Sequence, residues 1–334
     1  MTKAEELEKL FEEYKRIGID RQIDYDKFYL YSIITHSTAI EGSTVTELEN
    51  QLLFDQGITT SGRTLAELMM NLDLKAAYEK SLKYASAHSD VTIDILKELS
   101  AIVMKNTGSI YKTALGEFSS ANGDLRLLNV TAGIGGRSYM SYAKVPAKLK
   151  EFCDSLNEQR GKIAEKSIIE KYIMSFDAHY TLVTMHPWAD GNGRMARLLM
   201  NMLQFENGLI PTKILKEDRA EYIKALVATR EQENLDIFRN FMADVMIKNL
   251  KNDIRSFIDS TELLPTKTSK KEKSREKILR LLSDNNTMTT AMLASEIGIS
   301  SKAVEKHLAN LKRDGLLERI GPDKGGHWEV VKRS

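Results

Sequence analysis

The segment from His186 to Arg197 reads HPWADGNGRMAR and holds more chemically informative side chains than any other part of the chain. Its glycines let a backbone approach an anion closely, because they lack Cβ and reach positive φ. A helix that begins behind them offers unpaired N–H groups and partial positive charge. Arg194 and Arg197 are three residues apart, so they emerge on one face of that helix. The segment therefore predicts a pocket for a polyphosphate, with a base and a metal ligand beside it.

Two helices are expected to flank this segment. Residues 167–185 show helical periodicity before it, and Gly208 marks the end of a helix after it. The second helix carries an apolar stripe of Met195, Leu198, Leu199, Met202 and Leu203. Because the two arginines lie off this stripe, we expect the stripe to anchor the helix while the arginines face a cavity.

The rest of the chain as far as residue 258 is mainly helical in pattern. Helices are predicted over residues 5–16, 25–40, 65–88, 92–105, 145–158, 218–233 and 235–258, and Thr44 and Thr46 are N-cap candidates for one more. The pattern breaks between Gly108 and Pro146. There, the β-favouring pieces 127–131 and 137–142 flank a glycine-rich stretch and predict a β-hairpin.

The C-terminal part has the rhythm of a winged helix. A polar, charged linker covers residues 264–273. Helices are predicted over 275–283 and 290–297, and a third runs from Ser300 or Ser301 to Arg313. The strands 317–320 and 327–331 are expected to form the wing.

The third of these helices is the candidate nucleic-acid interface. Its outer side carries Lys302, Lys306, Asn310 and Arg313, and residues 270–334 hold 14 Lys and Arg against 9 Asp and Glu, a local charge of +5. This arrangement fits a helix-turn-helix that places its third helix in a DNA major groove. Winged helices also dock proteins, so both kinds of partner stay open, and nothing specifies a base sequence.

The overall composition fits a helical protein without a membrane segment. The 334 residues carry a net charge of +1, which favours no class of partner, and 42% are hydrophobic. No apolar run has membrane-spanning length, and the charged N-terminus lacks a signal-peptide core. Cys153 is the only cysteine, which excludes an intrachain disulfide and makes a reducing cytoplasm the expected location.

The His186–Arg197 segment resembles the signature of Fic-domain proteins: His, Pro, an aromatic residue, any residue, Asp or Glu, Gly, Asn, Gly, Arg, two spacers and Arg. Trp188 stands where that family usually has Phe, and we expect it to anchor the loop in the core. The resemblance covers roughly residues 25–258. It implies an enzyme, a protein adenylyltransferase that transfers AMP from ATP to a Ser, Thr or Tyr hydroxyl of a protein and releases pyrophosphate.

The chemistry of the side chains agrees with the roles that this resemblance implies. The imidazole of His186 titrates near neutral pH and suits a general base. The carboxylate of Asp190 suits Mg²⁺ that the phosphates already carry. The remaining groups are expected to bind phosphate: Gly191, Asn192, Gly193, Arg194 and Arg197. A zinc site on His179 and His186 is disfavoured because zinc needs three or four ligands, so we expect His179 to be packed and hydrogen-bonded.

A second pattern of the same family lies at Ser37-Thr38-Ala39-Ile40-Glu41-Gly42: Ser or Thr, three residues, Glu, then Gly or Asn. In Fic proteins this helix lies over the nucleotide site. Ser37 and Glu41 are one turn apart and share a face. The resemblance implies that Glu41 inhibits the enzyme by pairing with Arg197, which denies that arginine to the γ-phosphate. The alternative is a capped helix end with a solvated glutamate.

The predicted hairpin at residues 127–142 resembles the flap that holds a target segment by strand pairing in this family. Its first strand would supply the docking edge, from Leu127, Leu128, Asn129 and Val130. An ordinary surface hairpin is the alternative. Arg219 and Tyr222 are candidates for the adenine end of the pocket.

We therefore expect a mainly α chain: a Fic-type helical bundle with a small β-hairpin flap, followed by a winged helix-turn-helix. The expected parts are residues 1–94 with the inhibitory helix, 95–260 as the Fic core, 261–273 as a linker and 274–334 as the winged helix. Besides an adenylyltransferase, two functions stay open: a DNA-binding regulator whose helical domain senses nucleotide, and a hydrolase that removes AMP with Glu41 orienting water. The family also makes a homodimer an expectation.

Overall fold

The computed structural model describes residues 2–132, 137–263, 274–297, 299–321 and 326–331. The chain divides into two compact units, Met1–Ser256 and Phe257–Ser334. The predicted linker, residues 264–273, and the glycine-rich tip of the predicted hairpin, residues 133–136, lie outside the described residues. No described helix is both long enough and apolar enough to cross a lipid bilayer.

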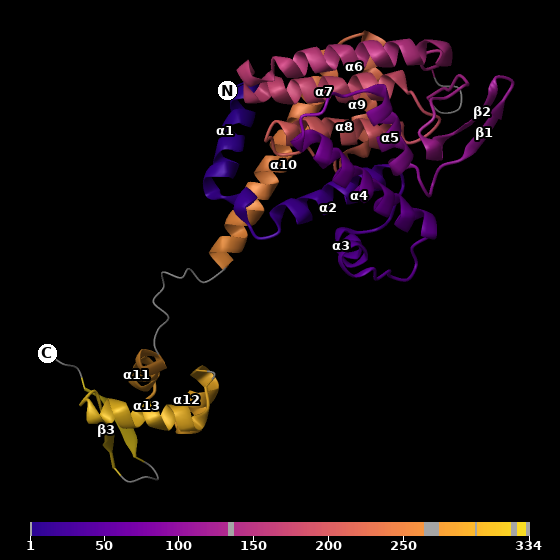
Figure 1. The fold of residues 1–334 in the computed structure, drawn as a ribbon. Coiled ribbons are helices and arrows are strands. Elements are labelled where there is room, and N and C mark those ends of the chain that lie inside the picture. Colours follow the sequence, from indigo (N-terminus) through magenta and orange to yellow (C-terminus); the bar gives the residue numbers. More distant parts are fainter. Residues whose placement is uncertain (1, 133–136, 264–273, 298, 322–325, 332–334) are drawn as a thin grey trace. The chain divides into compact units, whose positions relative to one another are not determined.

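The first unit is almost entirely helical (Figure 1). Its helices are α1 (Lys3–Ile17), α2 (Tyr25–Ile40), α3 (Glu47–Gln56), α4 (Leu65–Ser86), α5 (Ile93–Val103), α6 (Val145–Gly161), α7 (Ile168–Met185), α8 (Asn192–Glu206), α9 (Arg219–Gln232) and α10 (Leu235–Leu263), which continues past the unit's end. The mainly helical class is therefore confirmed, and the predicted helices agree with these bounds to within a few residues.

Short polar side chains fix where several of these helices begin. Thr46 and Thr64 each form a capping box. The threonine hydroxyl accepts from the backbone N–H of the glutamate three residues on, and the side chain of that glutamate accepts from the threonine backbone N–H. Thr2 and Ser167 cap α1 and α7 in the same way. Thr44, the other N-cap candidate, instead bonds the Glu67 carboxylate through both its backbone N–H and its hydroxyl.

The pair α7 and α8 forms the centre of the first unit. Every residue of the predicted apolar stripe on α8 is at most 2% exposed. The arginines off the stripe are buried as well, since Arg194 and Arg197 are each 3% exposed. The expected open cavity in front of them is thus covered, and α2, α4 and α5 supply the cover. A helix buried on all sides fixes the loop at its N-terminus rigidly.

The β-structure of the first unit differs from the prediction. A regular antiparallel hairpin lies at β1 (Ile110–Thr113) and β2 (Gly116–Ser119), and it projects from the helices (Figure 1). The segments 127–131 and 137–142 are joined by a single bridge, Thr131 to Ser138, with no regular strands. Two backbone hydrogen bonds flank that bridge, from Tyr139 N to Val130 O and from Ala132 N to Arg137 O. We keep the name flap for these two segments.

The second unit has the predicted winged-helix pattern. It contains α11 (Ser274–Asp284), α12 (Thr290–Ile297), α13 (Ser301–Arg313), β3 (Leu317–Ile320) and β4 (His327–Val330). Ser300 caps α13, and β3 pairs with β4 in antiparallel register. Its core includes Ile278, Leu293, Val304 and Leu311, all fully buried.

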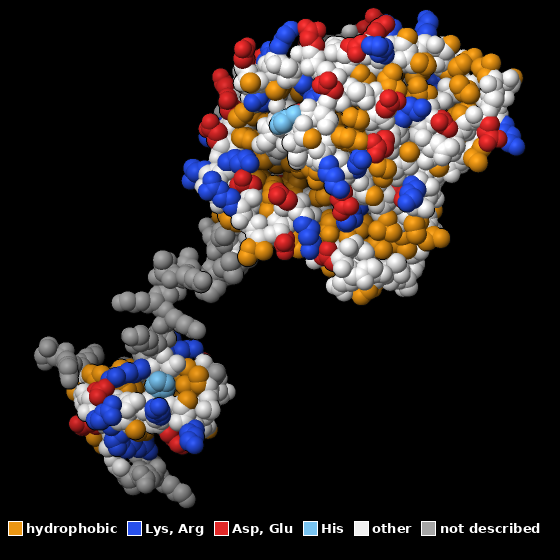
Figure 2. Space-filling model, in the orientation of Figure 1, with side chains coloured by type: hydrophobic (Ala, Val, Ile, Leu, Met, Phe, Trp, Pro, Cys, Tyr) orange, Lys and Arg blue, Asp and Glu red, His pale blue; other side chains and the backbone are white. Residues whose placement is uncertain are grey.

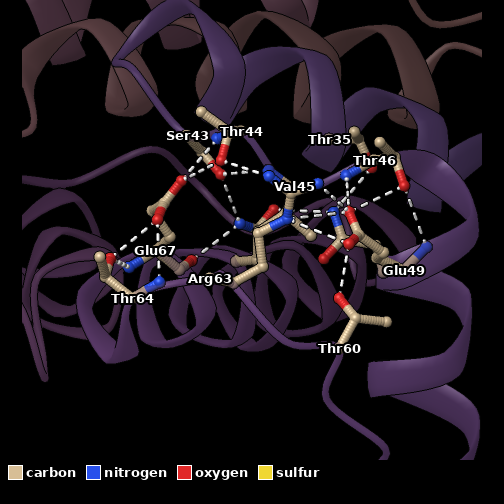
Figure 3. Close-up of polar contacts among 12 residues, drawn as sticks. Thr35, Ser43, Thr44, Val45, Thr46, Glu49, Thr60, Arg63, Thr64 and Glu67 are labelled. Atoms are coloured by element: carbon tan, nitrogen blue, oxygen red, sulfur yellow. Dashed lines mark hydrogen bonds and ion pairs between the residues drawn. The ribbon is translucent and has the colours of Figure 1, made fainter.

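A polar network joins α2 to α3 and α4 (Figure 3). Arg63 contacts the Glu49 carboxylate and donates to the Thr44 hydroxyl. Deeper in the unit, the Asn71 amide is fully buried. Its oxygen accepts from the Thr38 hydroxyl and from Asn50, and its nitrogen donates to the Ser43 hydroxyl. Because buried polar groups are costly when unpaired, this network fixes the chain around the end of α2.

We expect Asn71→Ala to lower the free energy of unfolding by about 1–3 kcal/mol, because several buried partners lose a hydrogen bond at once. Urea unfolding followed by circular dichroism measures the change. Gln56→Ala, at the exposed end of α3, is the matched control. An unchanged urea midpoint for Asn71→Ala would show that the network contributes nothing to stability.

Candidate functional site

The predicted base, His186, caps the C-terminus of α7. It adopts the left-handed conformation with φ 54°, which a residue other than glycine rarely adopts. Its backbone N–H donates to Leu182 O at 3.1 Å, and Pro187 prevents the helix from continuing. The imidazole Nδ1 lies 3.2 Å from the Val183 carbonyl oxygen. Since a carbonyl only accepts, Nδ1 carries the proton of the neutral ring, and Nε2 keeps a free lone pair.

The flap covers one face of this imidazole. The Tyr139 ring stacks on the His186 ring with centroids 4.0 Å apart, and the Arg230 guanidinium lies 5.5 Å from the Tyr139 ring. Burial lowers the pKa of His186 to about 4, and the positive charge of Arg126 acts in the same direction. The imidazole is thus neutral, and able to accept a proton, at every pH above this value. Beside the stack lies a cavity of about 380 Å³, lined by Tyr139, Tyr180, Met185, Arg230 and four neighbouring residues.

Hydrogen bonds of its own side chains hold the loop after His186 in place. The Trp188 side chain is fully buried, and its indole N–H donates to Gly123 O at 3.2 Å. The Asn192 side chain bonds both backbone groups of Trp188, at 3.1 Å to its N–H and 2.9 Å to its carbonyl. The buried Asn192 amide thus already closes the turn through these two hydrogen bonds. A phosphate contact, as predicted for Asn192, would compete with them. Gly191 sits at φ 78°, and an added Cβ would lie 2.7 Å from the Met104 sulfur.

Arg194 also has partners that the sequence did not indicate. Its guanidinium contacts the Met104 sulfur at 3.0 Å and the Val103 carbonyl at 3.5 Å, both at the end of α5. The Asp190 carboxylate lies 3.9 Å away. In this conformation Arg194 supports the underside of the loop. Its predicted contact with a phosphate stays a prediction and requires the side chain to leave these partners.

Arg197 lies beneath the end of α2 and is held there by three hydrogen bonds. It donates to the Ser37 hydroxyl at 2.8 Å, to the Ser37 carbonyl at 2.9 Å and to a Glu41 carboxylate oxygen at 2.6 Å. The Arg197 side chain is 3% exposed, whereas that of Glu41 is 34% exposed. The two segments with family patterns, residues 37–41 and 186–197, therefore meet at the Arg197 guanidinium.

The Glu41 carboxylate sits in a cationic environment. Burial alone would raise the pKa of Glu41, but the charge and hydrogen bond of Arg197, with the charges of Arg194 and Arg219, outweigh it and hold that pKa below its usual range. Arg219 also donates to the Ile40 carbonyl at 2.7 Å, which fixes the last turn of α2. A Cβ added to Gly193 would lie 2.7 Å from a Glu41 oxygen. The carboxylate thus rests directly against the N-terminus of α8.

Asp190 is the one predicted metal ligand, and its side chain is 59% exposed. One of its oxygens accepts from the Gly191 N–H at 2.6 Å. Among the described residues, no cluster of three or more His, Cys, Asp or Glu side chains could hold a metal ion. An exposed single carboxylate fits Mg²⁺ that keeps its waters and arrives with phosphates, rather than a metal held by the protein alone.

His179 belongs to the core, not to a metal site. It is fully buried, stacks on Phe238 and contacts the Tyr222 hydroxyl at 2.9 Å through Nε2. Burial, and to a lesser extent the charge of Arg197, lowers its pKa to about 3. Tyr222 is itself 1% exposed, so it lies beneath the site rather than on its surface.

Arg126 is a site residue that sequence reasoning missed. It is 1% exposed, and its guanidinium donates to the His186 carbonyl at 2.7 Å and to the Leu128 carbonyl at 2.7 Å. It also donates to the Met140 carbonyl. An arginine between two leucines, directly before the predicted strand 127–131, gives no local sign of such a role. Of the predicted docking residues, Asn129 accepts from the Tyr142 N–H, and Val130 pairs with Tyr139.

The predicted DNA-contacting residues share one exposed side of α13. Lys302, Lys306 and Arg313 are exposed, and Asn310 is half-buried. Figure 2 shows Lys and Arg side chains over the visible face of this unit, interspersed with acidic ones. Arg313 has Asp314 nearby, at 3.7 Å, which dilutes the positive charge at the end of the helix.

Two families match this chain. Residues 90–204 match the Fic/DOC family, and residues 271–318 match a winged helix-turn-helix DNA-binding family. Among named proteins, the chain is similar to protein adenylyltransferase fic-1 of Caenorhabditis elegans, with 27% identity over 208 residues, and to protein adenylyltransferase Fic of Drosophila melanogaster, with 26% identity over 262 residues. These matches cover 62% and 78% of this chain but only 37% and 49% of the two relatives.

Solved structures agree in fold. A Fic-domain-containing signaling protein from Bacteroides thetaiotaomicron matches 75% of this chain and 97% of its own, with a TM-score of 0.60 and 22% identity. A Fic family protein from Desulfovibrio desulfuricans matches 99% of this chain and 95% of its own, with a TM-score of 0.59 and 17% identity. At these identities the likeness concerns the fold alone.

We expect the His186 imidazole to titrate at about 4, because its burial disfavours the charged ring. Proton NMR of the ring signals against pH measures this, with His186→Ala to identify the signal. The same histidine in the urea-unfolded chain serves as the control and should titrate near its ordinary value of about 6.5. A folded-state value near 6.5 would contradict the burial of the ring by the flap.

Proposed function

We propose that the first unit, whose residues 90–204 match the Fic/DOC family, is a protein adenylyltransferase restrained by its own Glu41. The observation that carries this proposal is the position of Arg197, whose guanidinium is bound by Ser37 and Glu41 at the N-terminal end of α8. An arginine at that place is suited to a γ-phosphate, and a carboxylate on it keeps the phosphate away.

The reaction needs little covalent chemistry from the protein. The oxygen of a Ser, Thr or Tyr hydroxyl attacks the α-phosphorus of ATP, the bond from that phosphorus to the bridging oxygen breaks, and pyrophosphate leaves. The hydroxyl proton passes to His186 Nε2. Two features support this assignment: Nδ1 is engaged by the Val183 carbonyl, and the low pKa keeps Nε2 unprotonated at neutral pH. Positioning and charge compensation supply the rest.

The loop and the start of α8 offer backbone N–H groups and a charged side chain that could bind an anion. The N-terminus of α8 directs unpaired N–H groups toward the space beside Gly191 and Gly193. Asp190 would hold Mg²⁺, which when bound supplies positive charge to the phosphates. Arg197, once released by Glu41, would take the terminal phosphate. A bound triphosphate would therefore replace one anionic partner of Arg197 by another.

We expect Glu41→Gly to raise AMP transfer by about 5- to 150-fold, the range that a coupling free energy of about 1–3 kcal/mol gives. The reason is that Arg197 loses its competing carboxylate. Incubation with ATP labelled at the α-phosphate, in the presence of Mg²⁺ and cell lysate, followed by gel autoradiography and mass spectrometry, measures the transfer and names the target.

The double variant Glu41→Gly with His186→Ala is the control for this experiment and should lose the label. Equal labelling by Glu41→Gly and the unaltered chain would rule out inhibition by Glu41. Removal of AMP from a labelled target by the unaltered chain, but not by Glu41→Gly, would instead support a hydrolase that uses Glu41.

For the second unit we propose DNA binding through α13. The match to a winged helix-turn-helix DNA-binding family supports this, as do the exposed Lys302 and Lys306 on the outer side of the helix. A helix of this kind reads the major groove through its outward side chains, while lysines bind backbone phosphates. The sequence of the DNA stays open.

We expect Lys302→Ala and Lys306→Ala each to weaken binding to a random-sequence duplex and to reduce the slope of log affinity against log salt by about 0.9, because each removes one phosphate contact. Fluorescence anisotropy with a labelled 25-base-pair duplex measures this. Glu305→Ala, on the same helix, is the control and should not weaken binding. No binding by the unaltered chain at low salt would refute the proposal and favour a protein partner.

A further inference from the structure

Arg126 connects the loop of His186 to both segments of the flap. Its side chain donates to the His186 carbonyl, to Leu128 O in the first segment and to Met140 O in the second. Its backbone N–H donates to the Pro187 carbonyl at 3.1 Å. One residue therefore bonds two consecutive carbonyls of the loop and closes the base of the flap at the same time.

All the described acceptors of Arg126 are backbone carbonyls. No described carboxylate forms an ion pair with it, although its side chain is almost fully buried. Burying a cation without a counter-charge is costly, and burial accordingly lowers the pKa of Arg126. An apolar side chain of similar size would fill the space at lower cost. Unlike such a side chain, the planar guanidinium donates directed hydrogen bonds to three carbonyls.

The hydrogen bonds of Arg126 constrain the His186 imidazole in two ways, through the His186 backbone and through the Tyr139 ring. The carbonyl that Arg126 holds belongs to His186 itself, whose backbone is in the rare left-handed conformation. Met140, the acceptor in the second segment, follows Tyr139, whose ring stacks on the imidazole. Fixing the Met140 backbone thus fixes the ring that covers His186. The Nδ1 contact to Val183 orients the imidazole independently of Arg126.

We propose that Arg126 is a positioning residue, which fastens the flap to the catalytic loop and thereby sets the orientation of the His186 imidazole for proton transfer. This inference rests on the proposed adenylyl transfer. It assigns to Arg126 no contact with nucleotide, because its described partners all lie in the loop backbone and the flap. Its loss should therefore act on the rate of the chemical step rather than on ATP binding.

The test compares Arg126→Met with Arg126→Lys, both in the Glu41→Gly background. We expect Arg126→Met to lower kcat by about 10- to 100-fold, since a misplacement of about 1 Å can cost that much, with KM for ATP changed by less than about threefold. Arg126→Lys keeps the charge but cannot span three carbonyls, so it should recover part of the lost rate. The acidic limb of kcat/KM should move to higher pH in Arg126→Met, because the charge that lowers the pKa of His186 is gone.

Arg160→Met is the matched control. The Arg160 side chain is 8% exposed, and it bonds Glu206, Asn157 and the Ser89 carbonyl, all of which lie outside the loop and the flap. Its loss should lower the thermal unfolding temperature without moving the pH profile. Equal losses of kcat in Arg126→Met and Arg160→Met, with unchanged pH profiles, would overturn the proposal, as would full activity of Arg126→Met.

A second measurement separates this inference from the proposed function. If Glu41→Gly transfers no AMP, the function fails, but hydrogen exchange and the NMR titration of His186 still report on Arg126. Arg126→Met should speed exchange of the Tyr139 amide, which bonds Val130 O, and raise the pKa of His186. Unchanged exchange and an unchanged titration would show that Arg126 positions neither the flap nor the imidazole.

Discussion

The burial of one cation, Arg197, organises the first unit. A guanidinium that is 3% exposed must have hydrogen-bond acceptors and a counter-charge within the protein, because an unpaired buried charge costs several kcal/mol. In this structure Ser37 and Glu41 meet that requirement. In the proposed function, a nucleotide phosphate would meet it by displacing the carboxylate. The proposed inhibition needs no separate domain, because the resting partner of the arginine comes from the packing of α2 against α8.

The loop between α7 and α8 divides its work between two sets of groups. The first set consists of Trp188 and Asn192, together with Arg126 from outside the loop. Their side chains form hydrogen bonds with backbone atoms, which fixes the path of the chain. The second set is His186, Asp190, whose side chain is 59% exposed, and the backbone at Gly193, against which the Glu41 carboxylate rests. Rigidity in the first set is what allows the second set to be placed in advance of any ligand, and preorganised groups are the effective ones in phosphoryl chemistry.

Local signals predicted the helices, and the resemblance to Fic proteins implied the pairing of Glu41 with Arg197, but neither predicted the partners of Arg194 and Arg126. Helix starts followed from capping residues such as Thr46 and Ser300, whose contacts lie within four residues. The contact of Arg194 with Met104 was not predicted, because the two residues lie 90 positions apart in the sequence. The flap was expected as a regular hairpin from β-favouring residues, whereas Arg126 holds its base by side-chain bonds that replace a strand ladder. Regular pairing instead occurs at β1 and β2, where a tight two-residue turn precedes Gly116.

Gly193 has a consequence for how such a chain can change during evolution. The space where its side chain would begin is taken by the Glu41 carboxylate, 2.7 Å from the position of a Cβ. The same absence of a side chain is what an incoming phosphate would use. A side chain here would displace the end of the Glu41 side chain and would also narrow the space open to a phosphate. A chain of this kind would therefore lose the proposed self-restraint and keep catalysis more simply through a change of Glu41 on α2 than through a change of this glycine.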